Sequence, residues 1–296
     1  MFPFLFYARL LAYNIILSYF FKFYKNKYTI IIDYINKSMT YYLLGDNMLY
    51  PFILTTLAGL ATLLGTIPIF VKFKDKNKII SASCAFASGV MICVSILDLV
   101  PESLRYLKTN YQGITLIVLS FIFILIGIIT SLFLEKIVDS VSDDNNLFKV
   151  GILSMIAIIL HNIPEGIVTF IVSNRNIMLG VSICTAIALH NIPEGISIAV
   201  PIYYATKSKF KAIIYTSVSA ISELLGAIIT YLFLAKYIND TILGLILSFT
   251  AGIMIQISFN KLLPTGNNYH KNLARIFFII GFFFMIISLL LNNLIS

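Results

Sequence analysis

The string HNIPEGI occurs twice, at residues 161–167 and 190–196, and both copies lie inside long apolar stretches. Each copy places a histidine, an asparagine and a glutamate where hydrocarbon would surround a membrane helix. A charged side chain at the centre of a bilayer costs about 2.5–3.5 kcal/mol on insertion scales, so these groups need a strong partner. A divalent metal ion satisfies imidazole and carboxylate groups together. The repeated motif therefore indicates a membrane protein that handles metal ions near the middle of the bilayer.

The composition indicates an all-α integral membrane protein. Of the 296 residues, 59% are hydrophobic and 11% are charged, whereas about 25% of the residues in soluble domains are charged. Apolar runs of about 20 residues recur along the chain, and each is long enough to cross a hydrocarbon core of about 30 Å. We expect eight transmembrane helices, at residues 49–71, 79–104, 112–134, 149–173, 178–203, 209–235, 241–263 and 273–294.

The basic residues predict the orientation of the chain. The chain has a net charge of +8. Because its basic residues lie in short loops between the spans, we interpret this charge as a topology signal and expect no nucleic-acid partner. The positive-inside rule places the most basic loops in the cytosol and the C-terminus on the opposite side, in a plasma membrane or an organelle membrane. Twelve of the Lys and Arg residues lie in the loops 72–78, 136–149, 207–211 and 261–275.

The N-terminal part differs from the rest. Residues 1–48 combine an apolar segment, 1–21, with a mixed tether. The apolar segment is compatible with a signal segment, an interfacial helix or a ninth span, and no convincing cleavage site follows it. We expect residues 49–296 to form the eight-helix domain.

Two internal repeats predict an inverted-repeat organisation. The HNIPEGI copies fall on consecutive, antiparallel spans. The segment SGVMICVSILDLVP (88–101) also resembles AGIMIQISFNKLLP (251–264), on two spans that run in opposite directions. Similar segments on antiparallel helices are typical of an inverted-topology repeat, whose binding site lies at the repeat interface.

The histidine and glutamate of each motif are four residues apart, so they lie on one helix face. Each asparagine lies about 100° further round, where it can join the same cluster or bridge to a second ion. A third carboxylate, Glu223, lies near the middle of the next span. Mixed nitrogen and oxygen ligands suit zinc, iron(II) or manganese. The candidate metal ligands are His161, Asn162, Glu165, His190, Asn191, Glu194 and Glu223.

Other polar residues in the spans have less specific interpretations. Asp98 and Glu102, near the outer end of span 79–104, are compatible with either a structural role or a role in metal uptake. Gln256 and Asn260 are expected to hold helices together, and His270 is expected to lie in a loop.

The motifs also carry residues with mechanical effects. Pro164 and Pro193 lack an amide hydrogen and are expected to bend their helices. Gly166 and Gly195 are expected to allow close helix approach.

Two other kinds of protein, a membrane-embedded metalloenzyme and a metal sensor, are alternatives to a transporter. A membrane-embedded zinc protease would carry HExxH, but the residue after each histidine is asparagine. A di-iron carboxylate bundle uses Glu-x-x-His, but the order here is reversed. A metal-sensing protein that binds without transport would keep the same cluster. We expect transport rather than catalysis, with no catalytic cofactor and with the metal ion as cargo.

The chain resembles the ZIP (Zrt/Irt-like) family of divalent-metal transporters, and most of all its GufA-type branch. The resemblance rests on both HNxPEG motifs, on GLATLLGTIPIF (59–70) and on SELLG (222–226). It implies movement of zinc, iron, manganese or cadmium into the cytosol through a centre formed by spans four, five and six, in a protein that is expected to be a homodimer.

The chain departs from the family pattern in two places. Its loop at 136–149 is short and has no histidine, and Lys261 stands where relatives commonly have an acidic residue.

Overall fold

The computed structural model describes residues 49–141, 146–234 and 239–295, which form helices and short turns with no strand among them. The expectations for residues 1–48 lie outside the described residues. The long helices are α2 (Leu49–Leu64), α3 (Lys76–Val94), α5 (Gly113–Val141), α6 (Asn146–Arg175), α7 (Ile177–Thr206), α8 (Lys209–Ile229), α9 (Asp240–Ile257) and α10 (Leu263–Ile295). The short elements are η1 (Ile67–Phe70), η2 (Ser95–Leu99), α4 (Val100–Leu107), η3 (Thr230–Leu234) and η4 (Ser258–Leu262).

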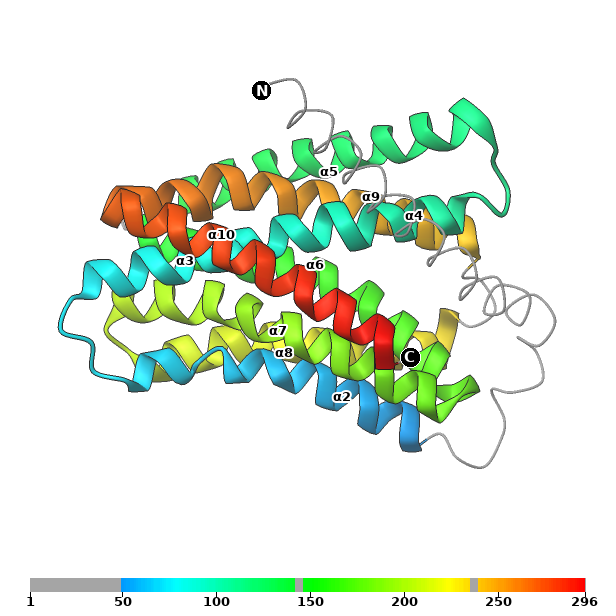
Figure 1. The fold of residues 1–296 in the computed structure, drawn as a ribbon, viewed down its shortest axis with the longest axis horizontal. Helices are drawn as coiled ribbons and strands as arrows, with labels where there is room; N and C mark the ends of the chain where they lie inside the picture. The colour runs from blue at the N-terminus through cyan, green and yellow to red at the C-terminus, as the bar shows by residue number, and fades with distance from the viewer. Residues whose placement is uncertain (1–48, 142–145, 235–238, 296) are drawn as a thin grey trace, which may run out of the picture. The chain divides into compact units, whose positions relative to one another are not determined.

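The described residues contain 7 stretches that are long and apolar enough to cross a membrane, and the last of them, Asp240–Leu291, has 52 residues. A straight helix of that length would measure roughly 78 Å, more than twice the thickness of the hydrocarbon core. His270 interrupts the stretch with non-helical backbone angles, and the chain reverses direction between α9 and the red part of α10 (Figure 1). Divided at His270, the stretch accounts for the two spans expected at 241–263 and 273–294.

Side-chain caps explain where several helices begin. The Asn176 side chain accepts hydrogen bonds from the backbone N–H groups of Met178 and Leu179, so α7 starts one residue after α6 ends. Lys207 has a φ of 58° and its N–H donates to Tyr203 O, which ends α7. The α6–α7 turn and the α7–α8 turn are therefore short, and the two HNIPEGI helices lie against each other.

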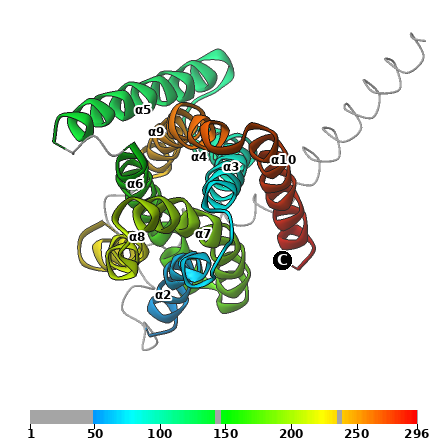
Figure 2. The ribbon, with the colours of Figure 1, turned by 90° about the vertical axis from the view of Figure 1, so that its left-hand side faces the viewer.

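The helices pack as two bundles. Helices α2, α6, α7 and α8 contact one another, and α3 packs against α10 while α5 and α4 pack against α9. The end-on view in Figure 2 shows α2, α7 and α8 together, with α3, α9 and α10 on the other side. Contacts of α3 with α7 and of α6 with α9 join the bundles. We call them the motif bundle (α2, α6, α7, α8) and the outer bundle (α3, α4, α5, α9, α10).

The inverted repeat is visible in an unusual backbone feature. Both η2 and η4 are π-helical turns, and both begin at the corresponding serine, Ser95 or Ser258, of the two matching segments. π-Turns are rare and occur mostly as single turns inside α-helices. Shared apolar composition does not place such a turn at the same position twice, so the match between 88–101 and 251–264 is structural.

A third repeat, which the sequence analysis missed, relates α2 to α8. The segment TTLAGLATLLG (55–65) aligns without gaps to TSVSAISELLG (216–226). Asn191 Nδ2 donates to Ala58 O at 2.9 Å, and Asn162 Nδ2 donates to Ser219 O at 3.1 Å. Ala58 and Ser219 occupy the same position in the alignment, so the contact of α7 with α2 mirrors the contact of α6 with α8.

The motif glycines repeat this mirror relation. A Cβ added at Gly166 would lie 1.9 Å from Glu223 O, and one added at Gly195 would lie 1.9 Å from Thr62 O. Glu223 and Thr62 also correspond in the alignment. The expected close helix approach at Gly166 and Gly195 is thus confirmed.

The outer bundle has the same symmetry. A Cβ at Gly89 of α3 would lie 2.2 Å from Phe278 O of α10, and a Cβ at the corresponding Gly252 of α9 would lie 2.1 Å from Ile124 O of α5. The pair α3–α10 therefore mirrors the pair α9–α5. Both members of every mirror-related pair of long helices therefore lie within the same bundle.

One span boundary in the sequence analysis was wrong. Span three was expected to end at residue 134, but α5 continues to Val141. The expectation followed from the charged residues Glu135 and Lys136, which end an apolar run without ending the helix. Glu135 consequently lies on a helix and faces the end of α9.

Candidate metal site

The HNIPEGI motifs bring their polar side chains together between α6 and α7. His161 and Glu165 lie near the middle of α6, and His190 and Glu194 lie near the middle of α7. Glu223 of α8 joins them. Each of these five residues is at most 8% exposed. Both helices continue past the motif prolines, so the side chains project from regular helical positions, and the expected bends remain predictions.

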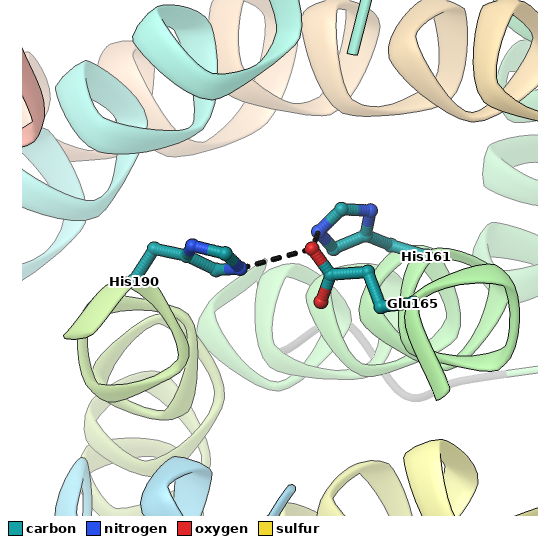
Figure 3. A group of neighbouring side chains, drawn as sticks. All are labelled: His161, Glu165 and His190. Carbon is teal, nitrogen blue, oxygen red and sulfur yellow. Dashed lines mark hydrogen bonds and ion pairs between the residues drawn. The ribbon is translucent and has the colours of Figure 1, made fainter. Parts of the chain in front are cut away.

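One carboxylate oxygen lies between two imidazole rings. Glu165 Oε1 is 3.0 Å from His190 Nε2 and 3.1 Å from His161 Nε2 (Figure 3). The ring centroids of the two histidines are 6.0 Å apart. Glu194 Oε1 is 3.5 Å from the same nitrogen of His161. His161, Glu165 and His190 therefore form a group whose ligand atoms all lie within 4.8 Å of one another.

The second part of the cluster contains the asparagines and Glu223. Asn191 Nδ2 donates to Glu223 Oε2 at 2.9 Å as well as to Ala58 O. The Asn162 amide instead bonds to α8, at Ser219 O. Both asparagines therefore hold neighbouring helices together through their amide nitrogens, which leaves their oxygens for other partners.

Many buried polar atoms of this cluster have no hydrogen-bond partner within the described parts of the chain. Leaving one buried donor or acceptor unpaired costs about 1–3 kcal/mol, and more for a charged group. A cation held among these oxygen and nitrogen atoms would offset that cost, so the donor set fits a metal ion. The atoms are His161 Nδ1, His190 Nδ1, Glu165 Oε2, Glu194 Oε2, Glu223 Oε1, Asn162 Oδ1 and Asn191 Oδ1, while His161 Nε2 and Glu194 Oε1 make only the ion-pair contacts given above.

Comparisons with known proteins show which family the chain belongs to. A family model described as "ZIP Zinc transporter" matches residues 139–289. A protein named zinc transporter ZupT from Clostridium perfringens is 39% identical over 281 residues, which cover 83% of this chain and 98% of the relative. Proteins of the same name from Streptococcus mutans and Oceanobacillus iheyensis are each 38% identical, and each alignment covers 99% of the relative. The chain belongs to the ZIP family.

Membership of the ZIP family confirms the resemblance found in the sequence. It also makes the chain a multi-pass membrane protein from a family of transporters rather than enzymes. The assignment to the GufA-type branch stays a prediction.

Asp98 and Glu102, the two carboxylates considered for metal uptake in this ZIP chain, have different surroundings. Asp98, in the π-turn η2, lies close enough to His190, Glu165 and His161 to interact with them electrostatically. Glu102, on α4, forms an ion pair with Arg105. Asp98 thus approaches the motif cluster from the outer bundle, while Glu102 is neutralised by its own helix.

Gln256 holds helices together as expected, but Asn260 does not. Ser131 Oγ donates to Gln256 Oε1 at 2.5 Å, and Gln256 Nε2 donates to Glu135 Oε2 at 3.1 Å, which ties α9 to α5. Asn260 is exposed. In a regular helix, residues four apart such as Gln256 and Asn260 share a face. The π-turn η4 inserts extra backbone between them and rotates Asn260 away from the helix contact.

Sequence reasoning missed the partner of Lys261. Its Nζ lies 2.6 Å from Glu135 Oε1, and Glu135 lies just beyond the end of the span expected at 112–134. In the repeat alignment Lys261 occupies the position of Asp98. The two mirror-related π-turns therefore carry opposite charges, and the positive one is paired with α5.

Proposed function

We propose that this protein transports zinc across a membrane through the motif cluster, with His161, Glu165 and His190 as the first ligands. The observation that carries the proposal is the position of Glu165 Oε1 between two buried imidazole nitrogens, at 3.0 and 3.1 Å. A cation shared by these three groups makes their close approach favourable. The name zinc transporter, which the relatives carry, supports zinc as the cargo.

The ligand spacing suits zinc. Zinc binds imidazole nitrogen and carboxylate oxygen at about 2.0–2.2 Å, usually with tetrahedral geometry, so neighbouring ligand atoms lie roughly 3.4 Å apart. The three nitrogen–oxygen distances around the two histidines are 3.0, 3.1 and 3.5 Å. Glu194 is then the fourth ligand. Iron(II), manganese and cadmium remain further predicted cargoes, because they bind the same donor types.

The remaining oxygens support a second position next to the first. Asn191 Nδ2 binds Glu223 Oε2, and this bond orients the pair beside the histidine cluster. With Asn162, these residues offer neutral and acidic oxygens without imidazole. We infer that an ion passes from the histidine-rich position to this oxygen-rich position, or that two ions share the carboxylates between them.

The bundle arrangement suggests which parts move. Transporters with inverted repeats commonly work by rocking one repeat against the other, but here both members of each mirror-related helix pair lie inside one bundle. We infer that the motif bundle, which carries all seven candidate ligands, moves as a unit against the outer bundle. Asp98 of the outer bundle would then meet the ion as it arrives and remain behind when the motif bundle moves.

The topology rests on the sequence. We propose that the loops at 72–78 and 207–211 face the cytosol, that the C-terminus lies on the opposite side, and that zinc moves toward the cytosol. The transporter domain would comprise residues 49–296, with 1–48 as a separate N-terminal part and a homodimer as the expected assembly.

Zinc accumulation by sealed proteoliposomes that contain the purified chain tests the proposal. We expect concentrative or gradient-driven uptake by the wild type, and its loss in the Glu165→Ala/Glu194→Ala double variant. Full uptake by a folded double variant would overturn the proposal. Zinc binding without any accumulation would favour a sensor over a transporter.

A further inference from the structure

The repeat alignment gives Glu223 a mirror residue, and that residue is Thr62. The two positions correspond in the α2 and α8 segments. A Cβ added at Gly166 would lie 1.9 Å from Glu223 O, and a Cβ added at the mirror-related Gly195 would lie 1.9 Å from Thr62 O. Glu223 stands beside the Glu165 motif, and Thr62 stands beside the Glu194 motif. The surroundings of the motif cluster are therefore nearly symmetric in backbone and asymmetric in this pair of side chains.

Packing follows the difference in side-chain size. A Cβ added at Gly59 would lie 3.1 Å from Glu223 Cβ and 3.3 Å from Glu223 Oε2, so the long carboxylate side chain runs over Gly59. The mirror position of Gly59 is Ala220, which has a Cβ. The shorter threonine needs less room there. Since Glu223 lies against Gly59, the repeat alignment pairs Thr62 with Ala220 in the same way and makes the two side-chain positions equivalent by symmetry.

The hydroxyl of Thr62 behaves unlike those of most buried threonines in the protein. A helical threonine usually donates to a carbonyl of the preceding turn. Within the described part of the chain, seven threonines donate to the carbonyl four residues earlier, namely Thr55, Thr56, Thr185, Thr206, Thr216, Thr230 and Thr250.

Thr62 does not follow this pattern. Its acceptor four residues earlier would be Ala58 O, which instead accepts from the Asn191 amide. Thr62 is 0% exposed, and its Oγ1 finds no partner among residues 49–141, 146–234 and 239–295. An unpaired buried hydroxyl costs about 1–3 kcal/mol.

The geometry points to Thr62 Oγ1 as a neutral oxygen donor to the transported ion. It would contact the ion directly or through a water molecule bound to the ion. Thr62 would do so beside the second motif, as Glu223 does beside the first. The inference rests on the proposed function, because it adds a residue to the same centre. A hydroxyl on one side and a carboxylate on the other make the two sides unequal in charge. The ion is then held strongly beside Glu223 and weakly beside Thr62, which favours release.

Thr169 is the other buried threonine whose hydroxyl has no partner in the part of the chain that the structure describes. Its mirror position, one repeat later in the second motif, is Ile198. Symmetry therefore assigns no ligand role to Thr169, and the inference concerns Thr62 alone.

The variant Thr62→Val keeps the shape of the side chain and removes the hydroxyl. Two measurements on the purified full chain separate a ligand role from a structural one: zinc affinity by titration calorimetry and the thermal stability of the metal-free protein. We expect zinc binding to weaken about tenfold or more, the range seen when a residue that supports a metal centre is removed. We also expect the metal-free variant to be at least as stable as the wild type, because an unpaired buried hydroxyl is gone.

The matched control is Thr55→Val, on the same helix and also 0% exposed. The Thr55 hydroxyl donates to Pro51 O, so its removal should leave zinc affinity unchanged. The conservative variant Thr62→Ser retains the oxygen and should bind zinc within about threefold of the wild type.

A folded Thr62→Val protein that binds zinc like the wild type would overturn the inference, and so would a loss of stability without a change in zinc affinity. If the wild type itself bound no zinc, the proposed function would fail instead.

A further variant, Thr62→Glu, supplies the mirror carboxylate, and we expect it to bind zinc more tightly and to transport it more slowly. Should that variant not fold, the valine and serine variants decide.

Discussion

Glu165 and Glu194 come from identical motifs, yet their surroundings differ. Glu165 Oε1 contacts both imidazoles, at 3.0 and 3.1 Å, whereas Glu194 Oε1 lies 3.5 Å from one of them. A carboxylate that reaches two other ligands is held in position before an ion arrives. Glu165 should therefore contribute more to zinc affinity than its repeat partner.

The isosteric variants test this ranking. We expect Glu165→Gln to weaken zinc binding at least a hundredfold, about 2.8 kcal/mol, and Glu194→Gln to weaken it less, because only the first removes a charge shared by two histidines. Titration calorimetry on the purified protein measures both. The control is Asp139→Asn, whose carboxylate pairs with Lys149 away from the motifs, and it should bind zinc normally. Equal losses in the two glutamine variants would contradict the ranking.

Proton release is a second prediction at the scale of residues. Imidazole and carboxylate ligands must be deprotonated to bind a metal ion, so binding displaces protons and weakens as the pH falls. We expect the apparent zinc-binding enthalpy to depend on the ionisation enthalpy of the buffer, and uptake to slow in acidic medium. Binding without any proton release at any pH between 5 and 8 would show that these groups are not the ligands.

At the scale of helices, the motif glycines set the distance between α6 and α8 and between α7 and α2. A Cβ at Gly166 would meet a backbone carbonyl at 1.9 Å, and a backbone atom cannot rotate away as a side chain can. The helices must separate to admit the methyl group. Overpacking of this kind typically costs about 1–3 kcal/mol.

We therefore expect Gly166→Ala to lower thermal stability and to impair zinc binding, although it touches no ligand atom. The control is Gly113→Asn, because Gly113 has a φ of 58°, which asparagine tolerates, and an added Cβ there meets nothing within 4 Å among the described residues. Circular dichroism melting and calorimetry measure the two effects. A fully stable Gly166→Ala protein with unchanged binding would disprove the close approach.

The site was more predictable from the sequence than the details of the helices. Histidine and glutamate four residues apart must share a helix face, and the motif repeats, so the grouping of His161, Glu165 and His190 followed from spacing. The π-turns did not, because an inserted residue leaves no local signature in an apolar helix. Asn260 was therefore expected to hold helices together, whereas its side chain is exposed.

Two further misses have similar causes. The relation between α2 and α8 was overlooked because the segments share few identical residues, and only the matching contacts of Asn162 and Asn191 reveal it. The span expected at 112–134 stops before Glu135, because a charge ends an apolar run, whereas α5 continues to Val141 and Glu135 pairs with Lys261. Both features depend on contacts between segments that are distant in the sequence.

At the scale of the whole molecule, the ligands and Asp98 lie on different bundles. If the motif bundle moves against the outer bundle, Asp98 assists the arrival of the ion without holding it. We expect Asp98→Asn to slow zinc uptake several-fold at low zinc concentration while equilibrium binding changes less than threefold, and Asp98→Glu to restore uptake. Loss of equilibrium binding in Asp98→Asn, as large as in Glu165→Gln, would make Asp98 a ligand and contradict this division.

The central claim is that a zinc ion binds between the histidines of the two motifs. X-ray absorption at the zinc edge, on the purified protein loaded with one equivalent of zinc, tests it most directly. We predict imidazole scattering from two histidines and zinc–ligand distances of about 2.0–2.1 Å. In the His190→Ala variant the scattering should come from one histidine. A zinc shell of oxygen alone, or one that is unchanged by removing His190, would contradict the account.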